Sequence, residues 1–122
     1  MRDGVLRVGA VVVFAYGTAV HAYDLVRGGL DVYGGYPGWL GAFYTGLIVL
    51  DAASAVLIGV KRRAGLVLGS AVLVADALAN GYAVYVFAPV PGFTLGNVGQ
   101  AVITGLAVGM LVVSHRLWRS FH

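Results

Sequence analysis

Ionisable side chains interrupt the long apolar runs of this sequence, and they are the residues best suited to carry chemistry. His21 and Asp24 lie three residues apart in the first run, Asp51 lies in the second and Asp76 in the third. An ionisable group at membrane depth costs roughly 2.5–3.5 kcal/mol on insertion scales, so such groups usually face a protein interior or a water-filled cavity. We therefore expect these side chains to point inward, where they could bind a ligand or move a proton.

The two central carboxylates, Asp51 and Asp76, support the most specific hypothesis about function. With about 1.5 Å of rise per residue, Asp51 and Asp76 both lie about 15 to 18 Å above the inner boundary, at the level of Tyr44 or Tyr16. Two carboxylates that face each other in a low dielectric cannot both stay ionised, so they would share a proton. Such a pair suits proton-coupled transport or general acid–base catalysis on a lipid-like substrate. Neutral acids that hydrogen-bond across helices are the structural alternative.

A second level of polar residues is expected nearer the outer boundary. At the same rise per residue, His21 and Asn80 lie about 24 Å above the inner boundary. The amides are equally well explained as interhelical hydrogen-bonding groups, and Asp24 as the partner of the arginine three residues later. The candidate ligand- or proton-binding residues are His21, Asp24, Tyr44, Asp51, Asp76, Asn80, Asn97 and Gln100.

Four apolar runs must position these side chains. Hydrophobic residues make up 60% of the 122 residues and charged residues 11%, whereas about a quarter of an ordinary soluble domain is charged. The runs span residues 8–26, 39–60, 64–87 and 93–114, each near the length of about 20 residues that a membrane-crossing helix needs. The sequence predicts one all-α domain over residues 1–122, an antiparallel bundle of four transmembrane helices with a polar axis.

The basic residues predict how this bundle is oriented. One side of the membrane receives Arg2, Arg7, Lys61, Arg62, Arg63, Arg116 and Arg119, and the other side receives Arg27. Because cytoplasmic loops carry an excess of Lys and Arg, both termini are expected in the cytoplasm, with the protein in the plasma membrane. Charges placed at the ends of apolar runs indicate topology, so no nucleic-acid partner is expected.

A weak internal repeat relates the two halves of the chain. Arg7, Gly9 and Asp24 align with Arg63, Gly65 and Asn80 at a constant offset of 56 residues. Both halves begin on the same side, so a duplication would be parallel, with its pseudo-axis along the membrane normal. Chance alignment of small apolar residues is the alternative.

Several kinds of chemistry find no support in the sequence. The absence of cysteine excludes disulfides, thiolate nucleophiles and iron–sulfur clusters. Only one histidine lies within the runs, which disfavours a metal or haem site. The sequence also lacks a phosphate-binding glycine loop, His-Glu-x-x-His and Gly-x-Ser-x-Gly. We expect no resident metal or cofactor.

Four segments carry a resemblance to known proteins: Val-His-Ala-Tyr-Asp-Leu-Val-Arg-Gly-Gly (20–29), Leu-Asp-Ala (50–52), Lys-Arg-Arg-Ala-Gly (61–65) and Val-Ala-Asp-Ala-Leu-Ala-Asn-Gly (74–81). The pattern resembles small four-helix membrane proteins of high-GC actinobacteria, and the layout loosely resembles DoxX-like proteins. This resemblance implies the fold and no activity. Small multidrug-resistance transporters are of similar size but carry a glutamate in the first span, and this chain has no glutamate.

The leading functional hypothesis is a bundle whose polar pocket, entered from the outer half, binds a small or lipid-like molecule and exchanges protons through Asp51 and Asp76. A proton-coupled transporter or channel, an accessory subunit of a membrane complex, and a membrane isomerase or cyclase are the alternatives. The lipid bilayer is the expected partner in each case. A small hydrophobic ligand, a homo-oligomer or a larger complex would be consistent with different alternatives.

Overall fold

The chain folds into helices throughout the part that the computed structural model describes, residues 2–28, 38–87 and 95–122. The elements in order are α1 (Arg2–Gly28), α2 (Gly38–Gly59), α3 (Arg63–Gly81), the π-helix η2 (Tyr82–Phe87), α4 (Leu95–Leu117) and the 3-10 turn η3 (Trp118–Ser120). Four helices are long and apolar enough to cross a membrane, with η2 completing the third. The four predicted spans are thus confirmed as helices. The wider π turn at the end of the third was not predicted.

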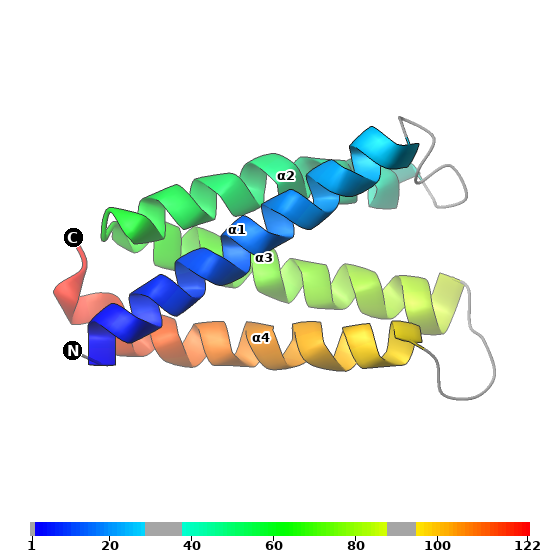
Figure 1. Cartoon of the computed structure of the whole chain (residues 1–122). Coiled ribbons are helices and arrows are strands. Elements are labelled where there is room, and N and C mark those ends of the chain that lie inside the picture. The colour runs from blue at the N-terminus through cyan, green and yellow to red at the C-terminus, as the bar shows by residue number, and fades with distance from the viewer. Residues whose placement is uncertain (1, 29–37, 88–94) are drawn as a thin grey trace.

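The helices lie side by side (Figure 1). The start of α1, the α2–α3 turn and the end of α4 meet at one end of the molecule. Asp3 forms an ion pair with Arg116 there, at 3.6 Å, and the backbone N–H of His122 donates to the Lys61 carbonyl at 2.8 Å. Lys61 makes the tight turn between α2 and α3 with a φ of 60°.

Packing follows the chain order. α1 packs against α2, α2 against α3 and α3 against α4, while α1 and α4 touch little. Figure 1 shows the reason: α1 starts beside the end of α4 and crosses the bundle obliquely toward the start of α2. The seam between α1 and α4 is therefore the least closed of the four.

The interior is apolar rather than polar. Its largest fully buried side chains include Phe14, Leu40, Leu47, Ile58 and Leu66. Among the described residues, the buried polar side chains are Asp51 and Ser54, and Ser54 donates to a carbonyl of its own helix. The expected polar axis is wrong, because close packing of the apolar side chains fills the centre and leaves most polar groups at the seams.

Two glycines of α3 permit this packing. A Cβ on Gly65 would lie 2.7 Å from the backbone nitrogen of Ile58, and one on Gly69 would lie 2.8 Å from the Phe14 ring. Helix backbones approach closely where small residues meet, as they do in many membrane bundles. Gly65 thus sets the distance between α2 and α3 beside their tight turn.

Candidate functional site

A groove runs along the seam between α1 and α4. It consists of two adjoining cavities, both open on one side. The outer cavity, of about 580 Å³, is the one that lies away from the two termini, and the inner cavity, of about 390 Å³, is the one nearer to them. The two cavities share the lining residues Val13, Phe14, Leu73 and Leu106. We call the whole feature the α1–α4 groove. Its volume falls within the range of about 300–1,000 Å³ that is usual for small-molecule sites.

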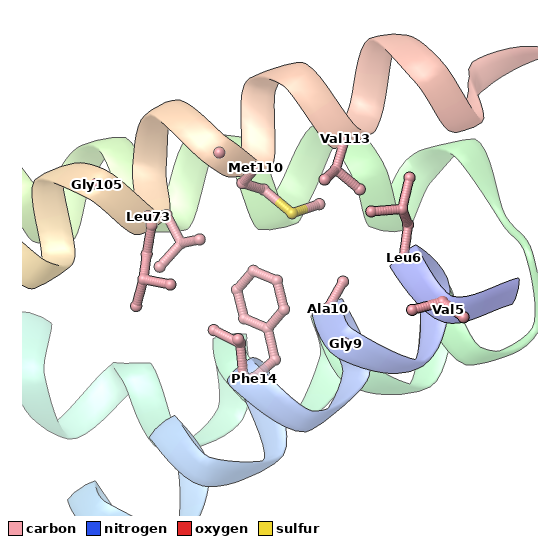
Figure 2. Close-up of a pocket in the computed structure, with 12 residues that line it drawn as sticks. Val5, Leu6, Gly9, Ala10, Phe14, Leu73, Gly105, Met110 and Val113 are labelled. Carbon is pink, nitrogen blue, oxygen red and sulfur yellow. The ribbon is translucent and has the colours of Figure 1, made fainter. Parts of the chain in front are cut away.

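The inner cavity of the groove is apolar. Figure 2 shows Leu6, Ala10 and Phe14 on α1, facing Met110 and Val113 on α4. Glycines on both helices widen this part: a Cβ on Gly9, Gly105 or Gly109 would meet nothing within 4 Å. Such a surface can hold an alkyl chain or another apolar body.

The outer cavity adds ionisable groups to this apolar wall. Asp51 of α2 and Asp76 of α3 line it together with Tyr16 and His21 of α1. The side of α4 contributes only Gly99, Val102, Ile103 and Leu106. The structure therefore brings both predicted carboxylates into the lining of one cavity.

The two carboxylates differ from the amide side chains of the bundle, which hydrogen-bond to each other. Asp51 is 5% exposed and Asp76 is half-buried, and no hydrogen bond or ion pair within the described residues reaches either side chain. Gly17 of α1 makes room for Asp51, since a Cβ there would lie 2.5 Å from Oδ2 of the carboxylate. Burial of an unpaired carboxyl group opposes folding, so this arrangement is not explained by bundle stability.

His21 lies beside the carboxylates and rests on Tyr44. The two rings stack with centroids 6.2 Å apart and an interplanar angle of 18°. The Nδ1 atom of His21 is buried without a hydrogen-bond partner among the described residues. Tyr44 lies behind the imidazole, outside the cavity wall, where it supports the ring that faces the groove.

The predicted amides lie elsewhere and bind each other. Asn80 of α3 donates to the Gln100 side chain of α4 at 2.8 Å, and Gln100 donates to the Ala77 carbonyl at 3.0 Å. Neither residue lines the groove. Asn97, one turn before Gln100, is half-buried and also lies outside the groove lining. Asn80 and Gln100 thus join α3 to α4, as the structural alternative predicted for them.

Asp24 also lies apart from the groove. It is half-buried and does not line the outer cavity. The expected pairing with Arg27 is absent from the described residues, because the Arg27 guanidinium donates to the Tyr23 hydroxyl at 2.7 Å and lies over its ring. Nothing in the structure connects Asp24 to the carboxylates in the groove.

The position at which the site opens could not be predicted from the sequence. Tyr16 was named only as a neighbour of the carboxylates, and the glycines that widen the groove are a few among the 19 in the chain. Within the described ranges no three His, Asp, Glu or Cys side chains gather closely enough to hold a metal ion. The site offers carboxylates, an imidazole and a phenol for hydrogen bonding and proton transfer.

Comparison of the chain with protein-family models, with curated proteins and with solved structures finds no match. The resemblance drawn from the sequence segments therefore stays a prediction, and the function must be argued from the groove itself.

Proposed function

We propose that this protein is a plasma-membrane protein that binds a small, lipid-like molecule in the α1–α4 groove. One observation carries the proposal: two carboxylates without protein partners lie at the end of an apolar groove. A polar group buried without a partner in the protein is commonly satisfied by water or by a ligand. An amphipathic molecule would place its polar part beside Asp51 and Asp76 and its apolar part along the inner cavity.

The contrast with the amides supports a functional role over a purely structural one. Polar residues that hold membrane helices together hydrogen-bond across the interface, as Asn80 and Gln100 do. The same is true of Ser70 and Ser114, whose hydroxyls lie 2.9 Å apart. The carboxylates have no such contacts, so an accessory subunit whose polar groups serve only packing is the weaker explanation.

The proposed topology is an antiparallel bundle with both termini in the cytoplasm. The start of α1, the α2–α3 turn and the end of α4 share one end of the molecule (Figure 1), and that end carries the basic residues other than Arg27. The excess of Lys and Arg favours the cytoplasmic side for this end. The polar part of the groove then lies in the outer half of the membrane.

We also propose that the two hairpins are parallel repeats. Arg7, near the start of the first hairpin, donates to the Gly59 carbonyl at the end of α2, at 2.7 Å. Its aligned residue Arg63, at the start of the second hairpin, donates to the Trp118 carbonyl after α4, at 2.9 Å. The aligned arginines thus each bind a carbonyl near the end of the second helix of their hairpin, although Gly59 and Trp118 are 59 residues apart rather than 56. This similarity favours duplication over chance alignment.

Filling the groove tests the proposed function. Gly105→Leu would place a side chain in the open space between α1 and α4. The control variant Gly46→Leu introduces the same side chain on α2, outside the groove. A Cβ at Gly46 also meets nothing within 4 Å. We expect calorimetric titration of the protein in phosphatidylcholine nanodiscs to show saturable binding of decanol by the wild type and by Gly46→Leu, and none by Gly105→Leu. Equal binding by all three would contradict a site in the groove.

A further inference from the structure

We infer that the ligand of the α1–α4 groove is an amphipathic cation, whose positively charged nitrogen lies between Asp51 and Asp76 and whose apolar chain follows the groove inward. This inference rests on the proposed function and specifies the chemical class of ligand. It follows from the charges that surround the outer cavity and from the absence of any cation already paired with them.

The titratable groups around the outer cavity come from three of the four helices. α2 contributes Asp51 and α3 contributes Asp76, α1 contributes His21 and Tyr16, and the α4 lining has no titratable group. No Lys or Arg lines the cavity. The side chains that line the cavity can therefore carry negative charge, and the one exception is His21, which is positive when protonated. A buried carboxylate needs a paired cation to remain ionised at low cost, and the described residues supply none.

The burial of Asp51 points to a ligand in a second way. Asp51 as a residue is 5% exposed, its carboxyl group has no hydrogen-bond or ion-pair partner among the described residues, and it lines the cavity. The missing side chain of Gly17 lets this carboxyl group lie against the backbone of α1. A bound ammonium group would supply the counter-charge that the described residues do not provide, and an opposite charge nearby favours the ionised carboxylate.

Basic residues near the inner end of the groove raise the question of whether the ligand is an anion or a cation. A further cavity of about 300 Å³, lined by Arg2, Val5, Leu6 and Arg116, adjoins the inner cavity through Val5 and Leu6. An anionic amphiphile would place its head there, among basic residues. Arg116 is already paired with Asp3, whereas the carboxylates of the outer cavity are unpaired. Arg2 has no ion-pair partner among the described residues either, but it is exposed. The unpaired charge that is also buried is that of Asp51, which favours a cation.

Three probes with the same alkyl chain separate these cases: decyltrimethylammonium, decanol and decanoate, titrated into phosphatidylcholine nanodiscs with empty nanodiscs subtracted. We expect the ammonium probe to bind the wild type most tightly. Asp51→Asn and Asp76→Asn, which keep side-chain shape, should each weaken its binding about tenfold or more, since an ionic contact is lost. Decanol binding should be unchanged, which also shows that these variants are folded.

The pH dependence provides a second readout. The quaternary ammonium does not titrate, so its binding should weaken as the pH is lowered far enough for the carboxylates to take up protons. Protonation of His21 would act in the same direction, and His21→Gln removes that contribution. Decanol binding should not change with pH. A purely structural role for the acids would not distinguish the two probes.

Three results would contradict either the inference or the proposed function, and they can be told apart. Equal binding of ammonium and decanol, unaffected by Asp51→Asn and Asp76→Asn, would overturn the inference while leaving the groove as a binding site. Tightest binding of decanoate, lost in Arg116→Gln, would also overturn it and assign the inner end to an anionic lipid. Failure of Gly105→Leu to affect any probe would instead contradict the proposed function.

Discussion

Asp51 and Gly17 form a matched pair, in which one helix lacks a side chain where the other places a carboxyl group. A Cβ on Gly17 would lie 2.5 Å from Asp51 Oδ2 and 3.2 Å from Cγ. Neither atom can give way freely, because Asp51 is almost completely buried. The position of the carboxyl group in the groove thus depends on a glycine of the neighbouring helix.

Gly17→Ala should therefore destabilise the protein by about 1–3 kcal/mol, as overpacking in a dense interior does. In an Asp51→Ala background the nearest atom is the Asp51 Cβ, at an ordinary 3.8 Å, and the same substitution should instead be neutral or stabilise by up to about 1 kcal/mol through helix propensity. Unfolding of the four variants in detergent would give the coupling energy. Additive effects would show that Gly17 does not hold the carboxyl group in place.

The sequence predicted some of these residue contacts and missed others. The common depth of Asp51 and Asp76 followed from helix rise alone, and the structure places both in one cavity. The depth of a residue along the helix does not show which neighbouring helix its side chain faces. For that reason Asn80 and His21, placed at one level, lie in different seams: Asn80 joins α3 to α4, and His21 faces the groove.

At the scale of the helices, identical motifs have different roles. Gly65-x-x-x-Gly69 and Gly105-x-x-x-Gly109 have the same spacing, and the sequence did not distinguish either from chance in a chain with 19 glycines. In the structure the first pair lies in close contacts and the second faces open space along the groove. The spans were predictable because apolar length decides them, but helix pairing depends on side-chain packing that a single sequence does not display.

Matched alanine substitutions should separate the two motifs. In Gly65→Ala the new Cβ would meet backbone atoms, Ile58 N at 2.7 Å and the Leu57 carbonyl carbon at 2.8 Å, so α2 and α3 must move apart at a cost of about 1–3 kcal/mol or more. Gly109→Ala meets nothing within 4 Å and should stabilise α4 by up to about 1 kcal/mol. Thermal unfolding in one detergent would compare them, and equal effects would contradict the packing of α3 described above.

The whole molecule has three well-packed seams and one that is open. α1 diverges from α4 as it crosses the bundle (Figure 1), and the groove follows that divergence. Ion pairing of Asp3 with Arg116 and the Arg7 contact with Gly59 hold the start of α1 at the basic end. The polar end of the groove therefore lies toward the opposite side of the membrane, and the orientation of the chain decides which compartment it faces.

Because the chain contains no cysteine, single cysteines can report this orientation. Gly4→Cys and Ser120→Cys place an exposed thiol at the basic end, and Gly38→Cys places one at the start of α2, at the opposite end. Additions at Gly4 and Gly38 meet nothing within 4 Å. The positive-inside bias predicts that a membrane-impermeant maleimide labels Gly38→Cys in intact cells, and labels the other two only after permeabilisation.

The reverse pattern would invert the topology and turn the carboxylates toward the cytoplasm. Opposite accessibility of Gly4→Cys and Ser120→Cys would contradict a bundle with an even number of crossings, because the two ends would then lie on different sides.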